Sequence, residues 1–219
     1  IKGFASMLET AEEDPKLVHF VEKILSGVTQ MTSLVDNIQD AGRYDPETGF
    51  YEMERAPTDL IDMVNRIVNT HLVPAEKEDV SLAVDIADDI PIVNVDMNMI
   101  ERSIINLVDN AIKYTPAGGK ILVETMERNG GVEIIVRDNG IGIPSDDLTH
   151  IFDRFYQVDK SRGPKRGTGL GLAITQEIIQ SHGGTIRIES EGVNRGTSVT
   201  VWLPSPKLST IITRRVSVD

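Results

Sequence analysis

Strand-like and helix-like patterns alternate along residues 50–204, and this order constrains the fold more than any other feature of the chain. Apolar periodicity predicts helices over residues 58–77, 98–114 and 170–180, with Thr58 as the N-cap of the first. Short apolar runs predict strands at residues 50–55, 80–86, 92–95, 120–127, 132–137, 185–189 and 197–203. The predicted fold class is α+β, a mixed sheet with helices in two layers.

The region before this alternation has a different pattern. Residues 1–10 and 16–44 carry helical apolar stripes, which predict a helical hairpin within an N-terminal domain of residues 1–48. A hairpin buries such a stripe incompletely, so we expect a homodimer built as a four-helix bundle. The alternative is that the stripe packs on the following domain, residues 49–205. The polar residues 206–219 are expected to form a mobile tail.

Charge and composition exclude several classes of function. The net charge of −12 argues against a general nucleic-acid partner, and the absence of cysteine excludes disulfides and cysteine-ligated zinc. No apolar run approaches the length of a membrane span, and the N-terminus lacks a signal-peptide pattern. Because the chain begins inside a helical pattern, we expect an excerpt of a longer protein. This region is expected in the cytoplasm, with any membrane contact made by regions outside it.

The first of three polar motifs lies in the segment of residues 106–114. Asn106 and Asn110 are four residues apart and share one helix face, and Lys113 and Tyr114 follow one turn later. Asn is a poor residue for a helix interior, whereas amide oxygens suit Mg²⁺. We therefore interpret Asn110 as a metal ligand, Asn106 as its support and Lys113 as a phosphate contact. The alternative is a solvent-facing helix that happens to carry Asn.

The second motif is Asp138-Asn-Gly140-Ile-Gly142, which ends a predicted strand. A carboxylate at this point can accept a hydrogen bond from an adenine amino group, and the glycines let the backbone approach the ring. Taken alone, the motif also fits an ordinary Asp-Asn-Gly turn.

The third motif is Gly167-Thr-Gly169-Leu-Gly171, which opens an apolar helix. Backbone N–H groups at such a helix start bind phosphate. The motif lies late in the chain, outside a strand-helix-strand unit, which excludes the dinucleotide-binding interpretation. The preceding residues 157–166 are basic and contain Gly and Pro, as expected for a lid over phosphates, although a solvated charged loop has the same composition.

Taken together, these motifs resemble the catalytic and ATP-binding domain of sensor histidine kinases over residues 50–204. Residues 106–114 match the N box of that family, residues 138–142 and 167–171 match its two glycine boxes, and residues 151–156 match its F box. The resemblance implies a Bergerat-type α/β sandwich that binds ATP and Mg²⁺, with Asn110 on the metal and with Asn106, Asn110 and Lys113 in catalysis. The nucleotide-binding residues that it implies are Asn106, Asn110, Lys113, Tyr114, Asp138, Gly140, Gly142, Ile143, Arg162, Lys165, Arg166, Gly167, Thr168, Gly169, Leu170, Gly171 and Thr197.

The implied reaction is transfer of the γ-phosphoryl group of Mg-ATP to a histidine, and then to an aspartate of a response-regulator receiver domain. The phosphoacceptor box of the family is not found in the chain and is expected upstream of Ile1, so the chain alone should only bind ATP. Its four histidines, His19, His71, His150 and His182, are expected to be structural or solvated, with His182 suited to capping a helix.

Two alternatives share the same fold, namely an ATP-gated clamp and a nucleotide-sensing module without kinase activity. The clamp branches place a water-activating Glu four residues before the metal-binding Asn. This chain has Asn106 at that position, which favours transfer to a protein acceptor over hydrolysis.

Overall fold

The computed structural model describes residues 44–45, 50–51, 53–158 and 168–206, all within one compact unit of the chain, Tyr44–Asp219. Residues 1–43 of the predicted hairpin and almost all of the predicted tail lie outside the described residues. The proposed domain limits and the homodimer therefore stay predictions.

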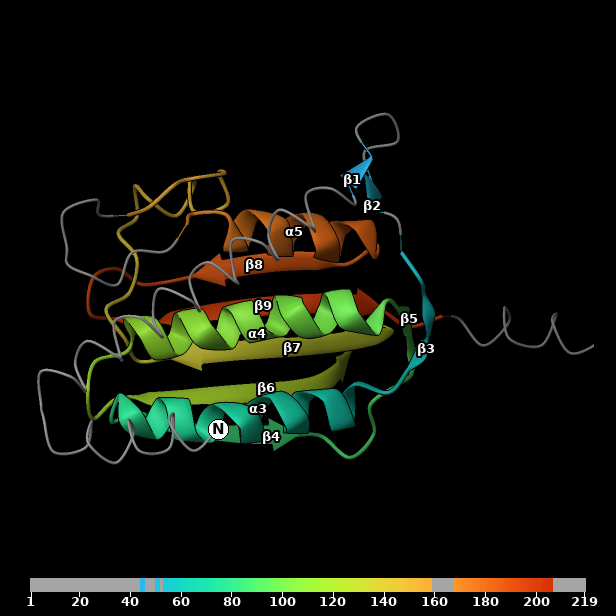
Figure 1. The fold of residues 1–219 in the computed structure, drawn as a ribbon, viewed down its shortest axis with the longest axis horizontal. Coiled ribbons are helices and arrows are strands. Elements are labelled where there is room, and N and C mark those ends of the chain that lie inside the picture. Colours follow the sequence, from blue (N-terminus) through green and yellow to red (C-terminus); the bar gives the residue numbers. More distant parts are fainter. Residues whose placement is uncertain (1–43, 46–49, 52, 159–167, 207–219) are drawn as a thin grey trace, which may run out of the picture. The chain divides into compact units, whose positions relative to one another are not determined.

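A five-stranded mixed sheet forms one layer of the fold (Figure 1). Its strand order is β4-β6-β7-β9-β8, in which β4 and β6 are parallel and the other neighbours are antiparallel. The strands of this sheet are β4 (Ser81–Ile86), β6 (Lys120–Arg128), β7 (Gly131–Asp138), β8 (Thr185–Glu189) and β9 (Thr197–Pro204). Asn129 and Gly130 join β6 to β7 with φ values of 53° and 72°, as a tight turn between antiparallel strands requires.

Two short antiparallel pairs lie outside the main sheet. One joins β1 (Tyr44–Asp45) to β2 (Phe50–Tyr51), and the other joins β3 (Ala56–Thr58) to β5 (Val93–Val95). The predicted strand over residues 50–55 is therefore wrong in its extent. Of that range, only Phe50 and Tyr51 form a strand, β2, and residues 53–55 have no regular structure. The next strand, β3, begins at Ala56 and pairs with β5.

Three helices form the second layer, namely α3 (Leu60–Lys77), α4 (Met97–Tyr114) and α5 (Gly171–Ser181). They cover one face of the sheet, with α3 packed beside β4, α4 beside β7 and α5 beside β8 (Figure 1). This arrangement confirms the predicted α+β class and the two-layer sandwich. Within the described part of the chain, no helix combines the length and the apolar character that a membrane span needs.

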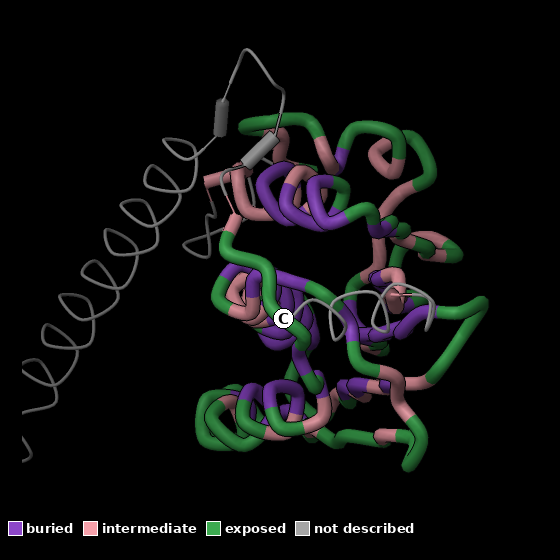
Figure 2. Tube along the Cα trace, turned by 90° about the vertical axis from the view of Figure 1, so that its right-hand side faces the viewer, coloured by how far each residue is buried: buried purple, intermediate pink, exposed green. Residues whose placement is uncertain are grey.

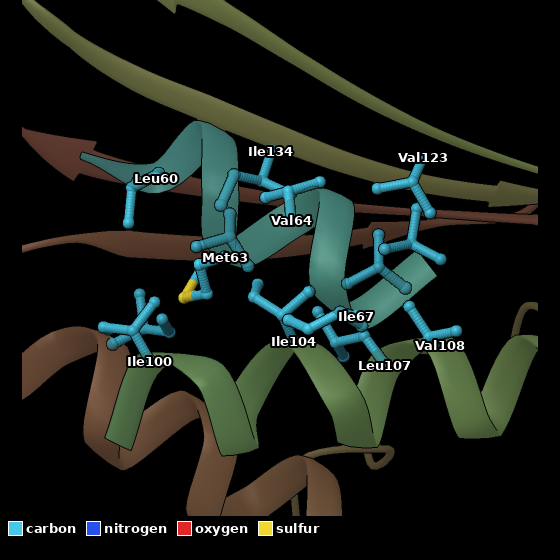
Figure 3. Packing of buried hydrophobic residues seen from close by; sticks show 14 of the residues in the cluster. Leu60, Met63, Val64, Ile67, Ile100, Ile104, Leu107, Val108, Val123 and Ile134 are labelled. Carbon is cyan, nitrogen blue, oxygen red and sulfur yellow. The ribbon is translucent and has the colours of Figure 1, made fainter. Parts of the chain in front are cut away.

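The core lies between these layers and fixes how the helices are rotated. Figure 2 shows the buried residues on the side of each helix that faces the sheet. In Figure 3, side chains of α3 and α4 meet Val123 of β6 and Ile134 of β7, both of which are fully buried. The apolar positions predicted for the core face of α4 are all buried: Ile100, Ile104, Leu107, Val108, Ala111 and Ile112. With that face turned inward, Asn106 and Asn110 are left half-buried at its margin.

A buried histidine joins the start of α4 to the end of α5. The backbone N–H of Asp96, the N-cap of α4, donates to Nε2 of His182 at 3.0 Å. The Nδ1 of His182 donates to the carbonyl of Ile178 at 2.7 Å, so the ring is neutral and caps the end of α5. Burial lowers the pKa of His182, and the nearby Arg55 acts in the same direction. The expected capping role of His182 is thus seen in the structure.

The N-cap of α3 differs from the prediction. Oδ1 of Asp59 accepts from the backbone N–H of Ile61 at 2.9 Å, so Asp59 is the cap. Thr58 is instead the last residue of β3, where it pairs with Val93 and donates its hydroxyl to the carbonyl of Ala56 at 2.9 Å. Strand pairing therefore occupies the residue that the sequence favoured as the cap.

We predict that Asp59→Ala lowers the free energy of unfolding by about 1 kcal/mol, because the N–H of Ile61 loses its acceptor. Urea denaturation followed by circular dichroism measures the change. The matched variant Asp59→Asn keeps a capping oxygen and should stay close to the parent protein. Equal losses for both variants would show that the cap is not the source of the effect.

Candidate functional site

Asn106 connects the first and third sequence motifs. It lies on α4, and its Nδ2 donates to Oγ1 of Thr175 on α5 at 3.0 Å. Gly171, the first residue of α5, lies directly against the same amide, because a Cβ at this position would come within 2.3 Å of Oδ1 of Asn106. A side chain larger than hydrogen would therefore displace the Asn106 amide from this position.

The second motif is tied to the end of α4. The N–H of Ile141 donates to the carbonyl of Tyr114 at 3.1 Å. Gly140 is buried beside that carbonyl, and a Cβ on it would lie 2.4 Å from the oxygen. The structure thus brings all three motifs together, and close approach within the protein explains Gly140 and Gly171 before any ligand is considered.

Asp138 ends β7 with a carboxylate held by backbone groups. Its Oδ1 accepts from the N–H of Gly140 at 2.8 Å, and the N–H of Thr197 also donates to the carboxylate. Thr197 therefore contacts Asp138 through its backbone. Burial raises the pKa of Asp138, and the two N–H groups oppose that rise. When ionised, this side chain is an acceptor only, and so it can bind an amino group.

The start of α5 has no side-chain cap among the described residues. The first backbone N–H groups of a helix have no partner within the helix, and such groups can bind a phosphate. Oγ1 of Thr168 accepts a hydrogen bond from the backbone N–H of Leu170. The carbonyl of Gly169 accepts one from the backbone N–H of Phe155 at 2.7 Å. Gly169 has a φ of 70°. The basic residues Arg162, Lys165 and Arg166, and also Gly167, lie outside the described residues.

Lys113 and Tyr114 contact each other at the end of α4. Nζ of Lys113 lies 4.8 Å from the centroid of the Tyr114 ring, a cation–π contact, and Tyr114 is exposed. The reach of Lys113 to a phosphate stays a prediction. Asn110 is half-buried one turn earlier, and Ile143 is half-buried behind the second motif.

The described histidines lie in contacts that fit a structural or solvated role. Nε2 of His71 is 3.3 Å from Oδ1 of Asp109, and hydrogen bonding to that carboxylate raises the pKa of His71. His150 is exposed, with its Nδ1 2.9 Å from Oδ2 of Asp153. His19 lies outside the described residues.

Two residues of the site were missed by sequence reasoning. Thr175 is almost fully buried and holds Asn106, while Ser190 lies behind the second motif and accepts from the N–H of Ile143 at 2.9 Å. The only signal for Thr175 was its position one helical turn after Gly171. Nothing in the sequence marked Ser190.

Comparison with known proteins identifies the family. Residues 95–207, just over half of the chain, match the family model described as histidine kinase-, DNA gyrase B- and HSP90-like ATPase. The chain belongs to this family. It is 30% identical over 200 residues to the sensor-like histidine kinase SenX3 of Mycolicibacterium smegmatis, covering 91% of this chain and 51% of the relative. It is 35% identical over 179 residues to the sensor histidine kinase WalK of Bacillus subtilis, covering 80% of this chain and 28% of WalK.

Solved structures agree with this assignment. The catalytic domain of the histidine kinase ThkA superposes with a TM-score of 0.62 at 28% identity, covering 70% of this chain and all of ThkA's solved chain. Full-length ShkA, solved in complex with AMPPNP, shares the fold, with a TM-score of 0.71 at 23% identity over 87% of this chain and 39% of ShkA. The chain thus contains an ATP-binding domain of the histidine kinase type, and it spans about half or less of these curated relatives' length.

We predict that Asp138→Asn weakens ATP binding by about 1.5–3 kcal/mol, the worth of a hydrogen bond to a charged group. Because the pKa of Asp138 is raised, the parent protein should lose this affinity as the pH falls through that pKa, above the usual Asp value of 3.8. The Asn variant should lack this pH-dependent loss. Calorimetric titration of both proteins across the acidic range, while each remains folded, measures the difference and cancels the titration of ATP itself. Equal affinities at neutral pH would remove Asp138 from the site.

We predict that Thr175→Val weakens ATP binding about fivefold, because Nδ2 of Asn106 loses its acceptor and the amide is free to turn. Val has nearly the shape of Thr, so the core around the residue stays filled. Thr175→Ser keeps the hydroxyl and serves as the control, with affinity near that of the parent. Binding by both variants at the parent level would show that Asn106 does not need this bond.

Proposed function

We propose that this chain is the ATP-binding part of a protein-histidine kinase of a two-component system. In this proposal the γ-phosphoryl group of Mg-ATP passes to a histidine outside the chain and then to an aspartate of a response-regulator receiver domain. The observation that carries the proposal is the setting of Asn106. It lies four residues before Asn110, where a hydrolytic branch carries a carboxylate, and its amide is bound by Thr175. An amide cannot take a proton from water as a general base, which leaves ATP for another nucleophile.

For each part of the nucleotide we propose a contact residue from the described part of the chain. Asp138 would accept from the adenine amino group, and the N–H groups at the start of α5 would bind the phosphates. Lys113 would add positive charge near the phosphates once it leaves the ring of Tyr114. The protein contributes positioning and charge neutralisation, and the chemistry belongs to the acceptor histidine.

Asn110 fits a magnesium site that is shared with ATP. Among the described residues no cluster of three or more His, Asp or Glu side chains could hold a metal on its own. Mg²⁺ usually takes one or two protein oxygens and completes its shell with phosphates and water, so one amide oxygen is a suitable ligand. When bound, the ion would neutralise charge on the β- and γ-phosphates.

The partners follow from the same proposal. We infer a receiver domain as the phosphoryl acceptor and a homodimer through the predicted hairpin of residues 1–48. The relatives named above are sensor histidine kinases, which supports both inferences, although the hairpin itself lies outside the described residues.

We predict that the 219-residue chain binds Mg-ATP without labelling itself, whereas the chain extended by its native upstream sequence acquires an acid-labile, alkali-stable phosphate from γ-labelled ATP. In the extended protein, Asn110→Ala should lower the labelling rate at least about tenfold, because an oxygen at the metal site is lost. Asn98→Ala, on the exposed start of the same helix, is the matched control and should label normally.

Two results would contradict the proposal. Self-labelling of the 219-residue chain would make one of its own histidines the acceptor. Steady release of inorganic phosphate without a labelled protein would favour an ATP-driven clamp instead.

A further inference from the structure

Ser190 bridges two segments of the candidate nucleotide site. It follows β8 directly, is half-buried, and accepts from the N–H of Ile143 at 2.9 Å. Its own hydroxyl proton goes to the carbonyl of Gly196 at 2.7 Å, while the alternative acceptor, the carbonyl of Gly192, is farther away at 3.4 Å. One small side chain thus joins the second motif to the loop between β8 and β9.

The same two segments are joined by backbone bonds around Ser190. The N–H of Asn194 donates to the carbonyl of Ile141 at 2.6 Å, and the N–H of Gly196 donates to the carbonyl of Gly140 at 3.1 Å. Gly142 is packed against this loop at a φ of 65°, where a Cβ would lie 2.0 Å from the carbonyl oxygen of Gly192. The β8–β9 loop is therefore the support on which the second motif rests.

The orientation of Asp138 depends on both segments. Its carboxylate accepts one hydrogen bond from the N–H of Gly140, in the second motif, and one from the N–H of Thr197, which follows the β8–β9 loop. The Ser190 hydroxyl bonds to Ile143, three residues after the first donor, and to Gly196, the residue before the second. If that link is lost, the two donors are held together only by the backbone bond from Gly196 to Gly140 and by the pairing of β7 with β9, so the carboxylate is less firmly fixed.

We infer that Ser190 is a positioning residue that sets the base selectivity of this site, an inference that rests on the proposed contact between Asp138 and adenine. An ionised carboxylate accepts hydrogen bonds only, so it favours a purine with a 6-amino group over one with a 6-oxo group. That discrimination requires a fixed carboxylate, since a mobile one can turn away from a 6-oxo group or reach another donor on the base. Ser190 supplies the fixation without touching the nucleotide.

The test compares adenine and guanine nucleotides on the full 219-residue chain. Calorimetric titration with non-hydrolysable ATP and GTP analogues gives the ratio of the two affinities. For Ser190→Ala we expect ATP-analogue affinity to fall about tenfold, the worth of one to two hydrogen bonds, with less than about a twofold change for the GTP analogue. Ser190→Thr keeps the hydroxyl and should restore most of the ratio. Ser198→Ala is the matched control, because strand alternation places Ser198 on the sheet face away from the helices.

A double-mutant cycle with Asp138→Asn tests whether Ser190 acts through the carboxylate. If it does, Ser190→Ala should have almost no further effect on ATP binding once Asp138 is replaced. Thermal unfolding of each variant shows whether the fold is kept. Ser190→Cys, of similar size but with a weak acceptor, gives the same comparison if the Ala variant does not fold.

The possible results distinguish a failure of this inference from a failure of the proposed nucleotide site. If Asp138→Asn binds the ATP analogue as the parent does, the proposed base contact fails and the inference fails with it. If Asp138→Asn weakens binding but Ser190→Ala leaves the ratio unchanged, the site stands and the inference is overturned. An equal loss for both nucleotides, tracking a lower melting temperature, would also overturn it, because that result is expected from a merely structural role.

Discussion

The burial of one face of α4 is the constraint on which the site depends. Ile104, Leu107 and Val108 are almost completely removed from water between the neighbouring helix and the sheet, which leaves the helix a single rotational setting (Figure 3). In that setting Asn106 and Asn110 lie at the margin of the core, where an amide is shielded from bulk water and still reachable by a ligand. The free energy of apolar burial therefore also determines where the polar groups of the site point.

The site is assembled by contacts of the protein with itself. Asn106 meets α5 at Thr175 and Gly171, and the end of α4 meets the second motif at Gly140 and Ile141. These contacts are short and directional, and they are made within the protein. Contacts of this kind hold site residues in place, which lowers the ordering cost of binding. They also give Gly140 and Gly171 a structural reason that is separate from proximity to phosphate or base.

Much of the fold followed from local pattern, because the patterns concerned were long or chemically specific. The eighteen residues of α4 showed their buried face in the sequence, and the Asn129-Gly130 turn joined two clearly alternating strands. The N-cap of α3 was misplaced by one residue, since Thr58 and Asp59 are both good caps and only the pairing of Thr58 with Val93 decides between them. The partners Thr175 and Ser190 could not be found in this way, because their bonds join residues 69 and 47 positions apart. Only the folded chain brings such residues together. The basic loop before Gly167, by contrast, was predicted from its composition alone.

The bond between Asp96 and His182 has a mechanical consequence for the two helices that flank the site. It pins the start of α4 to the end of α5, and the bond from Asn106 to Thr175 joins the same two helices again nearer to the site (Figure 1). The last two turns of α4, which carry Asn110 and Lys113, extend beyond both bonds. The backbone N–H of Glu54 donates to the carboxylate of Asp96 at 3.1 Å, so the segment that precedes β3 contacts the pinned end of α4. A change in that segment would therefore act on the two helices at the end opposite the candidate nucleotide site.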